Sequence, residues 1–328
     1  MSRILLLNGE AVHRLLDMTA CIDAMAEAML AVSNRTVAVP KRLIGALQDR
    51  SGLLAVMPGS SLAPPVFGAK VVSLLPGNPQ HGRPAIQGFI ALFDHATGAP
   101  VALVEGGAVT AIRTAAASGL ATRLLAREDV RSHGILGTGV QAVAHIDAIL
   151  AARPGIEETR VWGRDHAKAS ELAEQASRRF GRRVRAVREP WEASECDVVS
   201  TVTGASQPIL HGKWLRPGAH VNLVGAHRAD AREADTATIT RSDVYVDSRD
   251  SALAEAGDLL IPAGEGAWSL DAMRGEIGEV VAGGLAGRAE ADAITLYKSV
   301  GIFAQDLYAA WRVTCVARER GEGALVEW

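Results

Sequence analysis

The chain has 328 residues, of which 48% are apolar and 22% charged, and its formal net charge is −3. This composition is typical of a soluble globular protein with two domains, and the charge excludes an extended basic surface for nucleic acid. No stretch reaches the ~20 apolar residues of a membrane span, and the apolar run at residues 4–7 is too short for a signal peptide. We therefore expect a cytoplasmic protein with no nucleic-acid or membrane partner.

The cysteines and histidines give no sign of a metal centre. Cys21, Cys196 and Cys315 lie far apart and form no CxxC pair, and the nine histidines show no HxxxH or HxH spacing. Such usage predicts reduced thiols rather than a disulfide framework, and no metal.

The first third of the chain reads as a mixed α+β domain. Residues 17–33 predict a helix whose core-facing stripe consists of Met18, Ile22, Met25 and Met29. Residues 36–104 hold short branched runs separated by turn sequences such as "PGSS" and "PGNP", which predicts an antiparallel sheet with hairpins. The alanine-rich residues 110–126 predict a further helix.

From residue 131 to about 248, strands alternate with helices. A strand at 134–136 precedes a helix at 140–152, and a strand at 159–162 precedes a helix at 166–180; further apolar strands follow. This alternation predicts an α/β, Rossmann-type, doubly wound parallel sheet. We expect that domain at residues 120–296, and an N-terminal mixed α+β domain at 1–119 joined by a closing helix within 297–328, which begins at "YKSVGIFAQDL".

The sequence "GTGVQA" at residues 137–142 fits the pattern G-x-G-x-x-A between a strand and a helix. The first glycine permits a tight turn, the second leaves room for a pyrophosphate, and the alanine allows close packing of helix and strand. The helix N-terminus offers N–H groups to phosphates. We therefore expect a dinucleotide on five residues, Gly137, Thr138, Gly139, Val140 and Gln141.

The tip of the second strand of this domain distinguishes NAD from NADP. An acidic residue there binds the ribose 2′-hydroxyl of NAD, whereas an arginine accommodates the 2′-phosphate of NADP. This chain has Gly163 and Arg164 at the tip, and Asp165 is better placed to cap the next helix. NADPH is therefore favoured as the cofactor, with NADH as the alternative.

Three cations outside this domain are candidates for substrate binding. Lys70 interrupts an apolar strand and Arg113 an alanine-rich helix, while Arg42 lies in "VPKRLIG". A cation in such a segment either reaches solvent or is buried with an anionic partner. Together the three would bind a carboxylate, because arginine holds it in a bidentate fork and lysine as a point charge.

The chain resembles the ornithine cyclodeaminase/mu-crystallin family along nearly its whole length. The resemblance lies in "GAKVVSLLPGNP", "GGAVTAIRTAAAS", "GTGVQA", "VGAHRADARE", "YVDS", "GEIGEVV" and "TLYKSVGIFAQDLYAA", in this order. It implies a homodimer joined through N-terminal domains that also bind substrate, with the active site in the cleft between the domains. It further implies that Arg42, Lys70 and Arg113 bind the substrate carboxylate and that Lys70 handles a proton near the substrate nitrogen.

Within that family, three positions resemble the ketimine reductases more than the cyclodeaminases. His227 stands where the cyclodeaminases have an aspartate, Gly163-Arg164 replaces an acidic strand tip, and Lys298 replaces an aspartate before the "SVG" turn. The expected activity is NADPH-dependent reduction of the C=N bond of Δ1-pyrroline-2-carboxylate or Δ1-piperideine-2-carboxylate to L-proline or L-pipecolate. The alternatives are an ornithine cyclodeaminase, an alanine dehydrogenase, and a mu-crystallin-like protein that binds NADPH and a ligand without turnover.

The remaining candidate residues each have a structural alternative. The imine needs a proton from Lys70, a bound water or His227, but a loop histidine also bonds to backbone. Thr114 is either a substrate contact or a satisfied helical hydroxyl. By the same resemblance, Ser299 and Gly301 belong to the turn beside the nicotinamide. Thr201 and Thr203 follow a strand and are expected along the cofactor cleft, although strand-end threonines need no functional reason.

Overall fold

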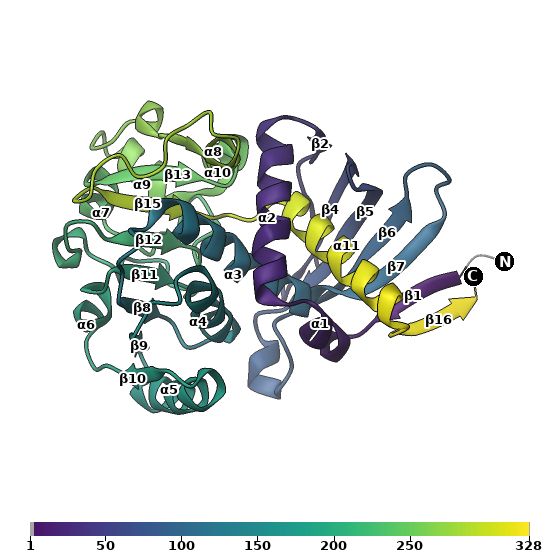
Figure 1. Ribbon diagram of the computed structural model, residues 1–328, viewed down its shortest axis with the longest axis horizontal. Helices are drawn as coiled ribbons and strands as arrows, with labels where there is room; N and C mark the ends of the chain where they lie inside the picture. Colours follow the sequence, from purple (N-terminus) through teal and green to yellow (C-terminus); the bar gives the residue numbers. More distant parts are fainter. Residues whose placement is uncertain (1–2, 328) are drawn as a thin grey trace. The chain divides into compact units, whose positions relative to one another are not determined.

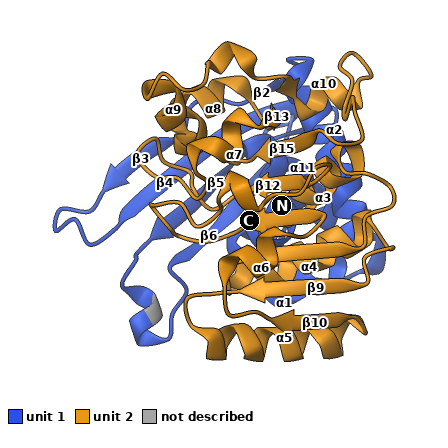
Figure 2. Ribbon diagram, turned by 90° about the vertical axis from the view of Figure 1, so that its left-hand side faces the viewer, with its two compact units in different colours: residues 1–114, 302–328 blue, residues 115–301 orange. Residues whose placement is uncertain are grey.

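The computed structural model describes residues 3–327, apart from the side chain of Pro79, and divides into two compact units (Figures 1 and 2). The first unit comprises the described parts of 1–114 and 302–328, and the second comprises 115–301. The chain leaves the first unit within helix α3 (Gly106–Leu125) and returns just after Gly301, rather than at 119/120 and 296/297. Among the described helices, none is long and apolar enough to cross a membrane.

The first unit contains a mixed sheet with the strand order β16-β1-β7-β6-β5-β4-β2, with β3 paired to β4. Its strands are β1 (Arg3–Leu7), β2 (Val37–Ala38), β3 (Leu43–Ala46), β4 (Leu53–Leu62), β5 (Pro65–Leu74), β6 (Ile86–Asp94), β7 (Pro100–Glu105) and β16 (Ala324–Glu327). All neighbours pair antiparallel except β1 and β7. The predicted antiparallel sheet between residues 36 and 104 is therefore confirmed.

Two long helices of this unit pack on each other, and one of them covers the sheet. Helix α2 (Met18–Ser33) packs against α11 (Phe303–Arg320), which contacts β4, β5 and β6 (Figure 1). The Asp17 carboxylate accepts the Ala20 N–H and so begins α2, while α1 (Gly9–Leu15) and the 3-10 turn η1 (Asn78–His81) are short. The predicted core stripe of α2 is confirmed, because its four members are all buried: Met18, Ile22, Met25 and Met29.

The second unit contains a fully parallel sheet with the order β10-β9-β8-β11-β12-β15-β13-β14. Its strands are β8 (Ser132–Leu136), β9 (Glu158–Trp162), β10 (Arg183–Ala186), β11 (Val198–Thr201), β12 (His220–Leu223), β13 (Ser242–Val246), β14 (Gly275–Glu276) and β15 (Ile294–Lys298). The strand order reverses between β8 and β11. In such sheets ligands bind beyond the carboxyl ends of the strands at this reversal.

Both faces of this sheet are covered, as a doubly wound fold requires. Ile135 and Leu136 are neighbours in β8, yet they belong to two different buried clusters, one on each face. The covering elements are α4 (Val140–Ala152), α5 (His166–Phe180), α6 (Pro190–Ser194), α7 (Thr236–Thr240), α8 (Arg249–Glu255), α9 (Gly257–Gly264), α10 (Ile277–Val281), and the 3-10 turns η2 (Gly212–Trp214) and η3 (Leu270–Ala272). The predicted Rossmann-type architecture is confirmed.

The predicted closing helix is wrong in its first residues. Tyr297 and Lys298 belong to β15, which is buried throughout and pairs in parallel with β12 and β13. Gly301 then takes φ +78°, a left-handed conformation that a continuous helix does not contain, so α11 begins only at Phe303. The edge strand β16, which pairs with β1 after α11, has no counterpart among the sequence-based expectations.

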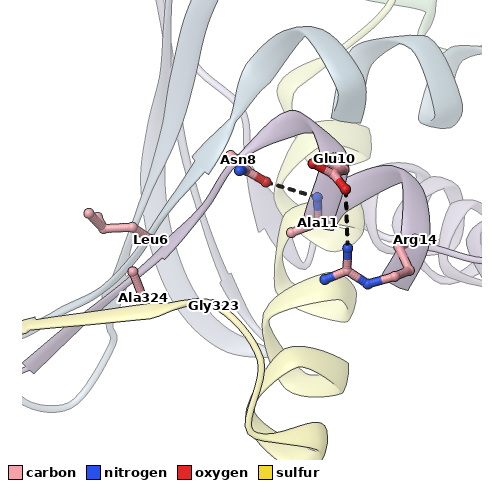
Figure 3. A pocket seen from close by; sticks show the side chains of 7 residues that line it. All are labelled: Leu6, Asn8, Glu10, Ala11, Arg14, Gly323 and Ala324. Carbon is pink, nitrogen blue, oxygen red and sulfur yellow. Dashed lines mark hydrogen bonds and ion pairs between the residues drawn. The ribbon is translucent and has the colours of Figure 1, made fainter.

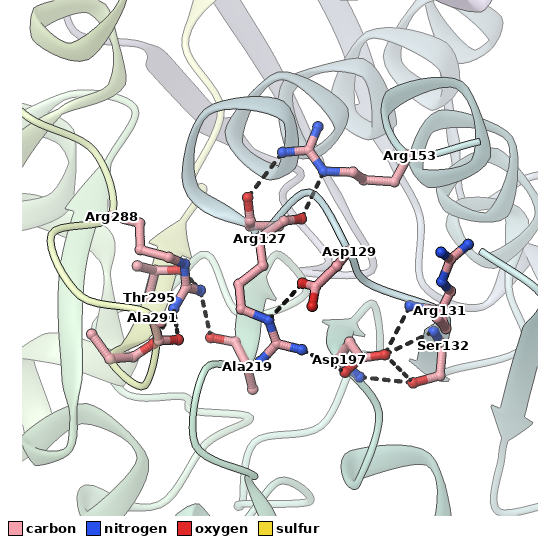
Figure 4. A network of polar contacts seen from close by, with 12 residues as sticks. Arg127, Asp129, Arg131, Ser132, Arg153, Asp197, Ala219, Arg288, Ala291 and Thr295 are labelled. Carbon is pink, nitrogen blue, oxygen red and sulfur yellow. Dashed lines mark hydrogen bonds and ion pairs between the residues drawn. The ribbon is translucent and has the colours of Figure 1, made fainter. Parts of the chain in front are cut away.

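A polar network fixes the amino-terminal edge of the parallel sheet (Figure 4). The Asp197 carboxylate accepts the N–H groups of Arg131 and Ser132 at 2.9 and 3.0 Å, and it pairs with Arg127 at 3.2 Å. The Arg153 guanidinium donates to carbonyl groups at the end of α3, those of Arg123, Ala126 and Arg127. Because these groups satisfy one another, they stabilise this edge of the sheet.

Candidate active site

The turn between β8 and α4 requires glycine at its first position. Gly137 takes φ +136°, and a Cβ there would lie 2.8 Å from the carbonyl oxygen of Val202. Its N–H donates to the Trp162 carbonyl at 2.9 Å, which ties the turn to the end of β9. The turn is therefore held tightly on its protein side.

The other side of the same turn is open. No side chain caps α4 at Gly139, and a Cβ on Gly139 would meet no atom within 4 Å among the described residues. Thr138 and Gln141 are half-buried, and Val140 is 74% exposed despite being apolar. An uncapped helix N-terminus beside open space fits a pyrophosphate, which accepts N–H groups and is favoured by the helix dipole.

The tip of β9 lies beside this turn. A Cβ on Gly163 would lie 2.5 Å from Cγ2 of Thr138, so glycine lets the two loops approach. Arg164 is exposed. The Asp165 carboxylate accepts the N–H groups of Ala167 and Lys168 at 3.0 and 3.3 Å, which confirms the prediction that Asp165 caps the next helix.

Thr201 and Thr203, at the end of β11, are bound to a carboxylate that the sequence did not reveal. Both hydroxyl groups donate to Glu233, each at 2.7 Å, and the N–H groups of Thr203 and Gly225 donate to it as well, also at 2.7 Å. Burial raises the pKa of the Glu233 carboxyl, although these hydrogen bonds oppose the shift. The two hydroxyls thus organise the loops after β11 and β12.

Lys298 extends this buried network. Its ammonium donates to the Asp258 carboxylate at 2.8 Å and to the Ala226 carbonyl, and both side chains are fully buried. The other Asp258 oxygen accepts the N–H groups of Glu233 and Ala234 at 2.7 and 3.0 Å. Lys298 therefore ties β15 to the loop after β12.

The turn Ser299–Gly301 is shaped by Asp247, which follows β13. One Asp247 oxygen accepts the N–H groups of Val300 and Gly301 at 2.9 and 2.7 Å and the Ser299 hydroxyl at 3.4 Å. Burial raises the pKa of the Asp247 carboxyl against these hydrogen bonds. The turn thus lies at the carboxyl edge of the sheet with its backbone N–H groups already bound.

His227 lies on the exposed loop after β12. Its Nδ1 is 3.1 Å from the Gly225 carbonyl oxygen, so Nδ1 is the donor of this hydrogen bond. This is the backbone-bound geometry that a loop histidine adopts without a catalytic role.

The first unit contains a buried cluster of charges. Oδ1 of Asp306 accepts hydrogen bonds from Nζ of Lys70 at 3.1 Å and from Nε of Arg113 at 2.9 Å. The relative exposure of the three residues is 0%, 4% and 5% respectively. A cation in an apolar segment either reaches solvent or is buried with an anionic partner, and these two cations are buried with an anionic partner.

Burial and neighbouring charges tune this cluster. Burial lowers the pKa of Lys70 to about 8; the Asp306 charge opposes this shift, while Arg113 and Arg42 add to it. Burial alone would raise the pKa of Asp306, but Arg113 and Lys70 bring it below its usual value. Half-buried Arg42 is therefore near enough for its charge to act on Lys70.

Two more residues adjoin Arg113. Nη1 of Arg113 donates to Oε1 of Gln305 at 2.6 Å, so α11 holds the guanidinium with two consecutive residues. Thr114, next to Arg113 in α3, is buried. Asp306 and Gln305 were not among the residues expected at the site. They are the polar pair inside the apolar run "IFAQDLYAA", and this pattern could have marked them in the same way that Lys70 stands out in its apolar strand.

A cavity of the first unit lies away from this cluster. It has a volume of about 380 Å³ beside α1 and β16 and is lined by seven residues (Figure 3), Leu6, Asn8, Glu10, Ala11, Arg14, Gly323 and Ala324. It contains none of the predicted site residues. In residues 3–327 no group of three His, Cys, Asp or Glu side chains is arranged to hold a metal ion, and the three cysteines are free thiols.

The model of the ornithine cyclodeaminase/mu-crystallin family matches residues 3–321. Delta(1)-pyrroline-2-carboxylate reductase of Bacillus cereus is 33% identical over 327 residues, which cover 99% of this chain and 100% of that protein. Ketimine reductase mu-crystallin of Mus musculus is 37% identical over 272 residues, 83% of this chain and 82% of that protein.

A solved structure is similar over the same extent. Delta(1)-pyrroline-2-carboxylate reductase of Thermococcus litoralis, in complex with NADH and L-proline, aligns with a TM-score of 0.94 at 38% identity and covers 98% of this chain and 100% of that chain. The cofactor class is thereby supported as a nicotinamide dinucleotide, in agreement with the open glycine turn.

Proposed function

Because this chain belongs to the ornithine cyclodeaminase/mu-crystallin family, we propose that it is an NADPH-dependent reductase of small cyclic imino acids. It reduces the C=N bond of Δ1-pyrroline-2-carboxylate or Δ1-piperideine-2-carboxylate, which gives L-proline or L-pipecolate. The observation that carries this proposal is the buried cluster of Lys70 and Arg113 on Asp306, because it presents cationic groups suited to a substrate carboxylate.

The cationic groups bind and orient the substrate. Lys70 and Arg113 carry two positive charges against the single charge of Asp306, so the cluster attracts a carboxylate, and the charge of Arg42 acts on Lys70 as well. Nη2 of Arg113 has no hydrogen-bond partner among the described residues, whereas Nε and Nη1 are bound by α11. The free edge of the guanidinium is the part that receives a carboxylate oxygen.

Lys70 is also the proposed proton donor. A C=N bond accepts a hydride more readily when its nitrogen is protonated, and an acid with a pKa near the working pH serves this step best. Burial brings the pKa of Lys70 to about 8, so its ammonium gives up a proton more easily than an exposed lysine does. Exposed His227, bound to the Gly225 carbonyl, is the second candidate.

The cofactor when bound supplies the hydride. The residues of the chain that would hold it are the open turn at Gly137–Gln141, for the pyrophosphate, and the Ser299–Gly301 turn, for the nicotinamide side. Exposed Arg164 at the tip of β9 is proposed to bind the 2′-phosphate. Asp165 is engaged as a helix cap, which supports NADPH over NADH.

We further propose that the chain forms a homodimer through its first unit. Val56, Val71 and Phe89 lie opposite one another on β4, β5 and β6, on the face of the sheet that points away from buried Lys70. None of the three is buried, and Phe89 is 43% exposed. A second copy would cover this apolar face. Sedimentation should give a dimer, and Phe89→Lys should give a monomer.

The activity is tested by following NADPH absorbance with each of the two imines, and again with NADH. Rapid NADPH oxidation supports the proposal, and the faster imine identifies the ring. A parallel sample with L-ornithine and NAD is assayed for ammonia, because ammonia without net change in cofactor would indicate a cyclodeaminase. Reduction of pyruvate that requires free ammonia would indicate an alanine dehydrogenase, and tight NADPH binding without any turnover would indicate a mu-crystallin-like binding protein.

A further inference from the structure

We propose that Asp306 is a positioning residue of this reduction: one oxygen of its carboxylate holds the ammonium of Lys70 and the guanidinium of Arg113 in the orientation that receives the substrate. The inference rests on the proposed function. It assigns a role to the "FAQDL" segment of α11, which neither the cofactor nor the substrate groups account for.

The contact joins three elements that are far apart in the chain. Lys70 comes from β5, Arg113 from α3 and Asp306 from α11, and both cations donate to the same Oδ1 atom at 3.1 and 2.9 Å. A shared acceptor fixes the two donors relative to each other, since each charge-assisted bond restricts one of them. The spacing between the ammonium and the guanidinium is therefore set by α11.

Asp306 acts through the cations rather than by touching the substrate. Its second oxygen, Oδ2, is closed to solvent and has no hydrogen-bond partner among the described residues. A carboxylate would also repel the carboxylate of the substrate, whereas the two cations attract it. An unpaired buried oxygen lowers the stability of the folded state. The two ion pairs of Asp306 must offset this destabilisation.

Gln305 also fixes the orientation of Arg113, because it accepts a hydrogen bond from the guanidinium. With Nε on Asp306 and Nη1 on Gln305, the plane of the guanidinium is fixed. The amide nitrogen of Gln305 is itself 3.9 Å from the Met29 sulfur in α2. The orientation of Arg113 is thus supported from two helices.

The charge of Asp306 also maintains the ammonium form of Lys70. The charges that act on Lys70 are Asp306 from α11, Arg113 from α3 and Arg42 from the segment before β3. Its register neighbours Met57 and Ile90 are apolar. Asp306 is therefore the one anionic group among these neighbours.

The test is the titration of Lys70 in the full chain with and without this charge. The sequence has five lysines, Lys41, Lys70, Lys168, Lys213 and Lys298, so protein labelled with ¹³Cε-lysine gives few signals, and Lys70→Arg assigns the relevant one. Asp306→Asn keeps an oxygen acceptor and the size of the side chain but removes the charge. We expect the Lys70 titration to move to lower pH by about 1–3 units.

A control separates this effect from loss of stability. Asp197→Asn also removes an ion-paired carboxylate, but one that pairs with Arg127 in the second unit. It should lower Tm and leave the Lys70 titration unchanged. If Lys70 titrates identically in Asp306→Asn and wild type, Asp306 does not set its charge and the inference is overturned, whether or not the protein reduces an imine.

The kinetic counterpart is the pH profile of kcat/KM for the faster imine. In Asp306→Asn the basic limb should move to lower pH together with the Lys70 titration, and kcat should fall along with a rise in KM. The titration of the imine itself is common to both proteins and cancels in the comparison. A uniform loss of activity with an unmoved limb would mean a merely structural role; an inactive wild type would refute the proposed function instead.

Discussion

Nζ of Lys70 lies 3.1 Å from Oδ1 of Asp306, and the side chains are only 5% and 0% exposed. A buried ion pair of this kind contributes little net stability compared with apolar packing. The ion pair instead holds charged groups inside the first unit. Because Arg113 shares the same oxygen, the cluster retains a net positive charge that a substrate carboxylate can neutralise.

Arg113→Ala removes the guanidinium edge that is proposed to bind the substrate carboxylate. We expect kcat/KM to fall about 10- to 150-fold, which corresponds to the roughly 1.5–3 kcal/mol of a hydrogen bond to a charged group. The dissociation constant of NADPH should stay within about twofold. Arg312→Ala on the exposed side of α11 is the matched control and should behave as wild type. Unchanged kinetics in Arg113→Ala would remove it from the site.

Arg164→Ala tests the choice of cofactor. The variant should bind NADPH more weakly by about 1–3 kcal/mol and bind NADH unchanged, because only NADPH carries the 2′-phosphate. Titration calorimetry with both cofactors measures this difference. Arg178→Ala, which removes another exposed arginine from the same unit, should affect neither. Equal losses for the two cofactors in Arg164→Ala would contradict the 2′-phosphate assignment.

Gly139→Ala separates cofactor binding from folding. The φ of Gly139 is −86°, which alanine also adopts, and the added Cβ meets no described atom within 4 Å. The change in unfolding free energy should therefore be about 0.5 kcal/mol or less, and Tm should stay within about 2 °C of wild type. NADPH affinity should fall at least about tenfold, because the methyl group occupies the space proposed for the pyrophosphate. By contrast, Gly163→Ala places Cβ against Thr138 and should lower Tm. Full NADPH affinity in Gly139→Ala would refute the proposed binding mode.

Three buried histidines predict a loss of stability in acid. Burial lowers the pKa of His133, His145 and His220 to about 3, 4 and 3. Above pH ~6.5 these groups are neutral in both states, but between pH ~6.5 and the folded-state pKa only the unfolded chain binds the protons. Each therefore costs on the order of 1–2 kcal/mol of unfolding free energy at pH 5.

Urea unfolding at pH 7.5 and pH 5 measures this loss. His145 bonds to Ser118 at 3.0 Å and to the Gln141 carbonyl at 2.8 Å, and His145→Gln preserves polar contacts while removing the titration. Its pH dependence should be smaller than that of wild type, whereas exposed His81→Gln should leave it unaltered. Equal stability of the wild type at both pH values would contradict the buried neutral state.

The fold could be predicted from the sequence where local pattern and tertiary environment agree. Helices α2 and α5 begin at capping aspartates and α4 begins after a glycine turn, all three show apolar periodicity, and all three were expected. The strand β15 was not, because "ITLYK" contains a lysine and precedes a helix. The buried Asp258 carboxylate neutralises Lys298 in this central strand, and it is 40 residues away in the chain.

The site was predictable to a similar degree. The glycine turn is recognisable from the spacing of its glycines, and Lys70 and Arg113 are recognisable as cations within apolar segments. Their common acceptor Asp306 could not be paired with them from sequence, because the contacts span 236 and 193 residues. The same holds for Thr201 and Thr203, whose hydroxyls are bound by Glu233, a carboxylate that nothing in the local sequence marks.

The measurement that tests the central claim most directly is isotope transfer from NADPH deuterated at C4 of the nicotinamide, using each C4 epimer in turn with the faster imine. The account predicts that one epimer gives L-proline or L-pipecolate with a single deuterium at C2, in step with NADPH consumption. A product without deuterium from either epimer, or proline and ammonia formed from L-ornithine with no net NADPH consumed, would contradict it.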